Sequence, residues 1–174
     1  MGARTSCPHS AKSSMLRGDQ IQIRLALRSD AAAIASVLSE SFREYKPLYT
    51  DGGFAATTPT TEQILDRMAE GPVWVALHRD VIVGTVAVVP KGEELYIRGM
   101  AVLPAERGRR IGELLLLHIE KFADANGHKR MFLSTTPFLA RAIRLYERFG
   151  FQRCDEGPHE LLGTPLFTMV KILQ

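Results

Sequence analysis

The chain has 174 residues, of which 45% are hydrophobic and 24% are charged, as in an ordinary globular protein that buries one core without disulfides or metals. The formal net charge of +3 comes from Arg4, Lys12 and Arg17, and the rest of the chain has 19 basic and 19 acidic residues. A neutral body argues against a nucleic-acid partner, because nucleic-acid binding needs a concentrated basic face.

The cysteines and the hydropathy of the chain indicate its cellular compartment and the kinds of partner to expect. Cys7 and Cys154 are too far apart in sequence to indicate a disulfide framework or a metal site, so no metal is expected and a reducing, cytoplasmic location is predicted. No apolar run approaches the ~20 residues that span a bilayer, so no membrane partner is expected. Residues 1–19, rich in small polar residues, are predicted to be a disordered tail, and residues 20–174 a single domain.

The first half of the domain shows strand and helix patterns in turn. Alternating apolar residues predict a strand from Ile21 to Leu27, and Ser29 or Asp30 can cap a helix that runs to Phe42. The next expected elements are a turn-rich connection at 46–59, a helix at about 61–70, and strands at 73–77 and 81–89 that form an antiparallel hairpin. Three aromatic residues lie in this connection or directly before it, and they either pack back on the core or line a pocket: Tyr45, Tyr49 and Phe54.

The stretch from Glu94 to Ala125 organises the chain. A strand at 95–103 leads through a Pro-bearing loop and an Arg/Gly cluster at 107–112 into a long helix with one apolar face. A Gly-bearing turn that feeds such a helix presents unpaired N–H groups and the positive end of the helix dipole. The pattern therefore predicts a phosphate site at this turn.

The last third of the chain again shows strand and helix patterns in turn. Asn126-Gly127 ends the long helix, and a short strand at 131–134 precedes a helix at about 138–149 that Pro137 opens. Strands at 151–154 and 166–172 then enclose a polar loop at 155–164.

Two segments of the chain form recognisable motifs: Ala101–Pro104 with Arg107–Gly112, and Ala142–Phe151. Together they resemble the signature segments of the GNAT superfamily of acetyl-CoA dependent N-acetyltransferases. The resemblance implies an α+β fold of three layers, the GNAT or acyl-CoA N-acyltransferase fold. Such a fold has a mixed, mostly antiparallel, twisted sheet of about seven strands flanked by about four helices. It also implies an enzyme, an N-acetyltransferase, with acetyl-CoA as its cofactor.

The same resemblance implies where coenzyme A binds. The cofactor would lie in a V-shaped opening beside the 95–103 strand, with its pantetheine on the strand backbone and its pyrophosphate on the N–H groups of the turn. The implied cofactor-binding residues are Met100, Ala101, Val102, Arg107, Gly108, Arg109, Arg110, Ile111 and Gly112. Two positions depart from the family pattern: Arg110 stands where the middle glycine is expected, and Leu139 where many members have asparagine.

Acetyl transfer to an amine needs an acid and a base. Tyr146 matches the family's frequent general acid, and a phenol of pKa ~10 is protonated at neutral pH; the alternative is that Tyr146 is only a core residue. Glu94 is the candidate general base. Strand alternation places Glu94 and Tyr96 on the face of Met100, so either could take the amine proton directly or through water. Glu94 could equally lie in a solvated turn, since many relatives leave this role to water.

The acceptor pocket is predicted from aromatic residues: Tyr45, Tyr49, Phe54, Tyr96 and Phe138. Apolar walls suit a small-molecule or amino-acid-like primary amine that attacks the thioester directly, and the rival acceptors are a protein N-terminus or a lysine. Two other classes stay open, a non-catalytic acyl-CoA-binding sensor and a nucleic-acid binder that uses the Arg cluster. Relatives are often dimers, which leaves a homodimer open.

Overall fold

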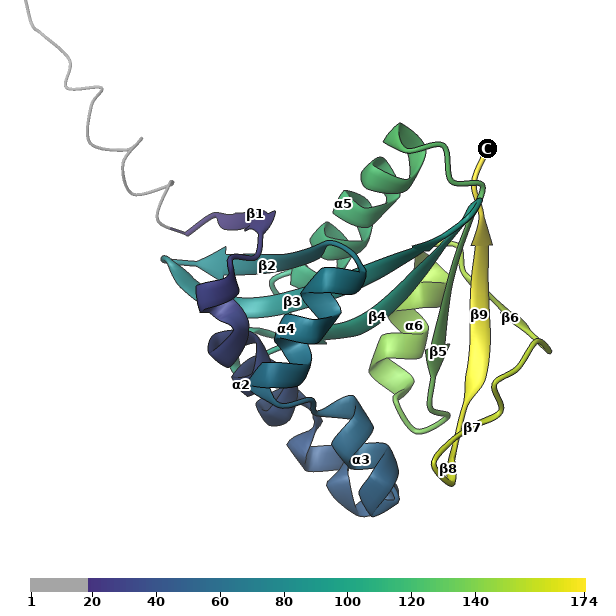
Figure 1. Cartoon of the computed structure of the whole chain (residues 1–174), viewed down its shortest axis with the longest axis horizontal. Helices are drawn as coiled ribbons and strands as arrows, with labels where there is room; N and C mark the ends of the chain where they lie inside the picture. Colours follow the sequence, from purple (N-terminus) through teal and green to yellow (C-terminus); the bar gives the residue numbers. More distant parts are fainter. Residues whose placement is uncertain (1–18) are drawn as a thin grey trace, which may run out of the picture.

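A seven-stranded sheet forms the body of the computed structural model, which describes residues 19–174 (Figure 1). The strands lie in the order β1-β2-β3-β4-β5-β9-β6, and every neighbouring pair is antiparallel except β4 and β5. Their bounds are β1 (Ile21–Leu25), β2 (Val73–His78), β3 (Val81–Lys91), β4 (Glu94–Val102), β5 (Arg130–Thr135), β6 (Gln152–Cys154) and β9 (Phe167–Ile172). The predicted mixed, mostly antiparallel sheet is confirmed. The predicted tail, apart from residue 19, lies outside the described residues.

Helices cover both faces of the sheet and produce three layers (Figure 1). On one face Ile34 of α2 (Ala31–Phe42) and Ile64 of α4 (Thr61–Glu70) pack in one buried cluster with β2 and β3. On the other face Leu115 and Ile119 of α5 (Ile111–Ala125) and Tyr146 of α6 (Ala140–Arg148) belong to a second, larger cluster. Within residues 19–174 no helix is long and apolar enough to cross a membrane.

The connection that follows α2 is helical, where the sequence had predicted turns. It contains the 3-10 helix η2 (Arg43–Leu48) and the short helix α3 (Asp51–Thr57), which adds a fifth α-helix to the expected four. The Thr50 side chain caps α3 by accepting a hydrogen bond from the Gly53 amide at 3.0 Å. The two glycines of α3 concealed this helix, since glycine disfavours helix interiors.

A long-range contact explains why α3 forms. The late polar loop contains a small hairpin of β7 (Glu160–Leu161) and β8 (Thr164–Pro165), which was not expected. The Thr50 amide donates to Thr164 Oγ1 at 3.0 Å, and Thr50 Oγ1 donates to the Leu162 carbonyl at 2.8 Å. A side chain at Gly53 would meet Thr164 Oγ1 at 2.2 Å, so the helix lies directly against the hairpin. Tertiary packing therefore overrides the low helix propensity.

A bulge in β4 changes which side chains share a face. The pairing with β3 shifts between Arg98 and Ala101, and Gly99 takes a φ of +58°, a conformation that suits glycine. Before the bulge Ile97 faces the α5 layer, whereas after it Ala101 faces the α2 layer and Met100 packs on the α5 side. The expectation that Tyr96 and Met100 share a face is therefore wrong, because the extra residue inverts the alternation.

Candidate active site

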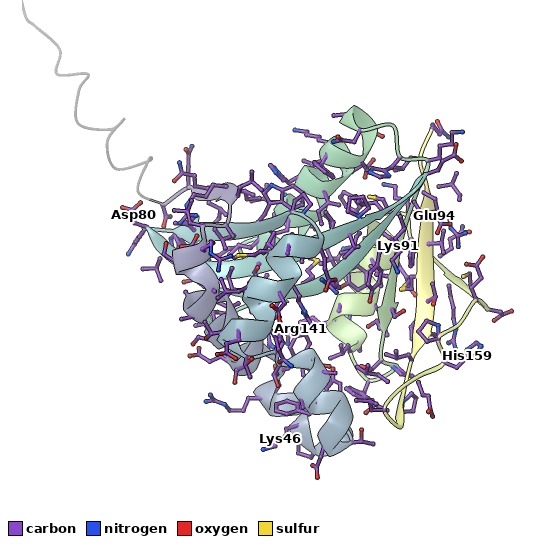
Figure 2. All side chains as sticks on the ribbon, viewed as in Figure 1. Lys46, Asp80, Lys91, Glu94, Arg141 and His159 are labelled. Atoms are coloured by element: carbon purple, nitrogen blue, oxygen red, sulfur yellow. The ribbon has the colours of Figure 1, made fainter. Side chains whose placement is uncertain are left out.

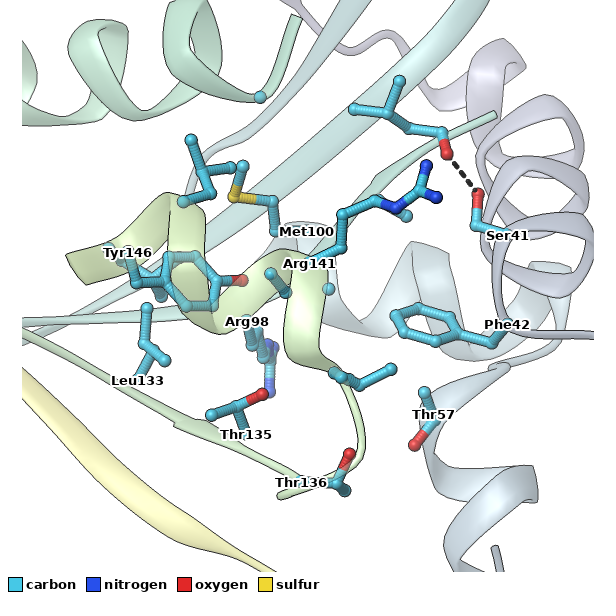
Figure 3. Close-up of a pocket in the computed structure, with 18 of the residues that line it drawn as sticks. Ser41, Phe42, Thr57, Arg98, Met100, Leu133, Thr135, Thr136, Arg141 and Tyr146 are labelled. Atoms are coloured by element: carbon cyan, nitrogen blue, oxygen red, sulfur yellow. Dashed lines mark hydrogen bonds between the residues drawn. The ribbon is translucent and has the colours of Figure 1, made fainter. Parts of the chain in front are cut away.

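The strands β4 and β5 separate in the middle of the sheet. They pair from Glu94 to Ile97 on β4 and from Arg130 to Leu133 on β5, and beyond these residues each strand follows its outer neighbour (Figure 1). A pocket of about 590 Å³ occupies this region, lined by β4, β5, α6, the turn after β4 and the connection after α2 (Figure 3). The opening predicted beside the key strand is present.

The turn between β4 and α5 forms one end of the pocket. Arg107, Gly108, Arg110, Ile111 and Gly112 all line it. Within the described residues, only the Arg107 amide among those from 107 to 112 donates to a backbone carbonyl, that of Pro104 at 3.3 Å. The amides that open α5 therefore have no acceptor on the main chain, and the helix dipole adds partial positive charge there. This arrangement suits a phosphate.

The arginine side chains of the turn are largely committed to carboxylates. Arg107 pairs with Glu44, and Arg110 pairs with Glu113 at 3.0 Å. Arg109 does not line the pocket: its guanidinium lies 3.0 Å from Glu106. The main-chain amides are therefore the donors left available for an anion at this turn, and the arginines add positive charge nearby.

Beyond Ile97, β4 still pairs with β3 on one edge, but its other edge has no partner strand and faces the opening, as pantetheine binding would require. Met100, Ala101 and Val102 all line the pocket. The Val102 carbonyl accepts a hydrogen bond from Ser41 Oγ at 3.0 Å, which ties α2 to this strand (Figure 3). A carbonyl oxygen has two lone pairs, so Val102 can accept a second hydrogen bond.

Tyr146 is buried in α6, and its hydroxyl points into the pocket (Figure 3). Its ring packs edge-on against Phe151, with ring centroids 5.9 Å apart. Burial raises the pKa of Tyr146 to about 12, with a smaller contribution from Tyr49. The phenol therefore keeps its proton at any physiological pH and can act as a hydrogen-bond donor or proton donor.

The other end of the pocket is aromatic. Tyr45, Tyr49 and Tyr96 line it, and burial raises the pKa of Tyr49. Phe54 and Phe138 do not line the pocket but support this wall: Phe138 lies 4.8 Å from the Tyr49 ring and 6.3 Å from the Tyr45 ring, and Phe54 lies 5.9 Å from Tyr49. The structure thus brings all five predicted aromatic residues to one region, three of them in the cavity wall.

Glu94 does not reach the pocket. It lies where β4 and β5 converge, apart from the pocket residue Arg141 (Figure 2), and its carboxylate pairs with Arg130 at 2.9 Å. The described residues also contain no group of three or more His, Cys, Asp or Glu side chains that could hold a metal. Of the two candidates for the base, only Tyr96 faces the cavity.

Four pocket arginines were not anticipated: Arg67 from α4, Arg98 from β4, and Arg141 and Arg148 from α6. Arg98 follows Tyr96 by two residues on the same strand face, so strand alternation from Tyr96 would have found it. Arg67 lies far away in sequence, and no local pattern connects it to the strand. Thr135 and Thr136, at the end of β5, were also missed.

Comparison with known proteins agrees with this geometry. A family model described as the acetyltransferase (GNAT) family matches residues 34–151, more than half of the chain. An uncharacterized N-acetyltransferase from Escherichia coli K12, YjgM, is 32% identical over 138 residues, which are 76% of this chain and 81% of that protein. The chain belongs to the GNAT family.

Solved structures show the same fold. The PaiA N-acetyltransferase of Thermoplasma acidophilum, in complex with coenzyme A, has a TM-score of 0.77 and 19% identity over 88% of this chain and 99% of that one. YncA of Salmonella typhimurium, a putative acetyltransferase with its cofactor acetyl-CoA, has a TM-score of 0.69 and 22% identity over 88% and 94%. As a GNAT acetyltransferase, the chain is an acyltransferase that depends on acetyl-CoA.

Arg110, at the position of the replaced glycine, adopts a backbone conformation that glycine takes freely. Arg110 takes the left-handed conformation, with φ 63° and ψ 24°, at the position before α5 where the family has glycine. Gly112 serves helix packing, since a Cβ there would lie 2.7 Å from Leu145 of α6. Leu139, in place of the usual asparagine, lines the pocket immediately before α6 and contributes an apolar wall.

Proposed function

We propose that this GNAT enzyme transfers an acetyl group from acetyl-CoA to the primary amine of a small, amino-acid-like molecule. One observation carries the proposal: a single pocket extends from the unpaired amides before α5 to the aromatic wall, with the Tyr146 hydroxyl inside it. Donor and acceptor can therefore occupy one cavity together. That geometry favours direct attack in a ternary complex.

The donor half of the site would be held mainly by the main chain. The amides from Gly108 to Gly112 would hold the pyrophosphate, and the free edge of β4 from Met100 to Val102 would pair with the pantetheine. Acetyl-CoA supplies an acetyl group activated as a thioester. Pairing along β4 would place that group beside the aromatic wall, because the strand leads from the turn toward Tyr96.

The acceptor must lose a proton before it attacks, since an ammonium of pKa ~10 has no lone pair. Tyr96 is positioned to pass this proton to water, whereas Glu94 is paired with Arg130 outside the cavity. Tyr146 would then protonate the departing thiolate. The burial that raises the phenol pKa would also raise the pKa of a thiol bound beside it, so the difference between the two pKa values would stay close to its value in water.

A substrate screen tests the proposal. Purified protein would be incubated with acetyl-CoA and a panel of primary amines, and the released thiol would be measured together with the acetylated product. We expect thiol release with small amines and calorimetric binding of coenzyme A. Coenzyme A binding with no turnover on any small amine, peptide N-terminus or lysine peptide would contradict the enzyme assignment and indicate a sensor.

A further inference from the structure

Two guanidinium groups meet at the acceptor end of the pocket. Arg98 extends from β4, and Arg67 approaches from α4, where its guanidinium lies against the β4 bulge: a Cβ at Gly99 would be 3.2 Å from Arg67 Nη1. Arg67 Nη2 donates to the Ala56 carbonyl at 3.2 Å, and Arg98 Nη2 donates to Glu70 at 2.5 Å. Both side chains are thereby fixed in place and keep other N–H groups available.

The charges at this end do not balance. Glu70 is the only carboxylate paired with either arginine in the described residues, and the two acids that line the pocket, Glu106 and Glu113, are engaged at the far turn. Burial and the charge of Arg98 lower the pKa of Arg67, and the smaller opposing effects of Tyr96 and Glu70 do not offset this decrease.

One donor of this pair is also unsatisfied. Arg98 Nε is buried and has no hydrogen-bond partner within residues 19–174. A buried N–H without an acceptor is unfavourable, and a planar guanidinium matches the two oxygens of a carboxylate. The pair is thus suited to receive an anionic group that comes with a ligand.

Coenzyme A does not provide that group. Its phosphates belong at the turn before α5, and β4 continues for four residues from Arg98 to Val102, about 13 Å of strand, before the turn begins. The pantetheine arm that would lie along β4 is uncharged. An anion bound at Arg67 and Arg98 would therefore come from the acceptor.

We infer that Arg67 and Arg98 bind a carboxylate of the acceptor, so that the substrates of this enzyme are amino acids or similar amino carboxylates. This inference rests on the proposed acetyl transfer. It disfavours polyamines, whose positive charges would meet two arginines, and neutral amines, which would leave the guanidinium groups without a counter-charge.

The first test compares matched substrates on the wild-type enzyme. The twenty L-amino acids would be assayed beside their primary amides, which keep the amine and the side chain and lose the carboxylate; spermidine and an aminoalkylphosphonate complete the panel. We expect kcat/KM for the best amino acid to exceed that of its amide by about 10- to 100-fold, the range for charge-assisted hydrogen bonds. The amine of the amide is less basic than that of the amino acid and is more often unprotonated. This difference alone would favour the amide, so it cannot produce the expected preference for the amino acid.

The second test removes the guanidinium groups. In Arg67→Gln and Arg98→Lys, the ratio of kcat/KM for the acid to kcat/KM for its amide should fall at least tenfold, with KM for acetyl-CoA unchanged. Arg98→Lys keeps a cation opposite Glu70, which protects the fold. Arg43→Gln, on the exposed surface of η2, is the matched control and should keep the preference. Thermal unfolding checks that each variant is folded.

The outcomes separate the two proposals. Wild-type preference for an amide or spermidine over the amino acid would overturn the carboxylate site and leave acetyl transfer standing. Preference for the phosphonate would overturn the carboxylate in favour of a phosphorus oxyanion. Absence of turnover with every amine, despite coenzyme A binding, would remove the proposed function and this inference with it.

Discussion

Replacing Tyr146 by Phe removes one hydroxyl and keeps the packing of the ring. The ring is buried against Phe151, whereas the hydroxyl faces the pocket. We therefore expect the free energy of unfolding to change by less than ~0.5 kcal/mol. Removal of a general acid lowers kcat by about 10²-fold or more, which corresponds to ~2.7 kcal/mol of barrier.

The assay measures thiol release at saturating acetyl-CoA and amine, with the coenzyme A Kd measured separately by calorimetry. Phe151→Leu is the packing control, since Phe151 is 2% exposed and touches the same ring. It should lower the stability by about 1–2 kcal/mol and leave kcat within about threefold. If Tyr146→Phe keeps kcat within about threefold at unchanged Kd, the phenol has no catalytic role and Tyr146 is a core residue.

Three further predictions concern stability and titration. Gly53→Ala should lower the stability by about 1–3 kcal/mol in urea unfolding, because the new Cβ would lie 2.2 Å from Thr164 Oγ1; an unchanged midpoint would refute the contact. Arg110→Gly should leave the stability unchanged or raise it by up to ~1 kcal/mol, and Arg110→Val should lower it by about 1–2 kcal/mol, because only glycine takes the left-handed conformation freely. The tyrosinate absorbance of wild type minus Tyr146→Phe should titrate near pH 12 rather than ~10. Because the folded pKa is the higher one, the stability from this group is present below pH ~10 and is lost as the pH rises toward 12.

Features encoded by neighbouring residues could be predicted from the sequence. The apolar face of α5 and the turn before it lie within one stretch of the chain, so spacing alone indicated the helix and the position of the turn, whose anion site stays a prediction. The position of Tyr146 followed from the resemblance of its helix to a family motif. The helix and the turn concern main-chain geometry and the period of one element, and the motif around Tyr146 likewise lies within a single element.

Features that depend on distant contacts could not be predicted in this way. The helix α3 has two glycines and forms against a hairpin whose Thr164 lies 114 residues from Thr50. The bulge at Gly99 reverses the faces of β4, and a strict alternation cannot anticipate one extra residue. Strict alternation therefore places Glu94 and Tyr96 on the same face as Met100, whereas Met100 packs on the other side of the strand.

The two halves of the pocket differ in the kind of group proposed to recognise the ligand. This difference explains why the sequence indicates the donor and not the acceptor. In the proposed site, the donor end would use amides of one turn, which any sequence that keeps the turn provides, even with Arg110 in place of glycine. The acceptor end would use side chains from separate elements, Arg67 on α4 and Arg98 on β4, and such side chains can change without altering the fold. Family membership therefore identifies the donor, whereas the acceptor must be inferred from the charges that the fold brings together.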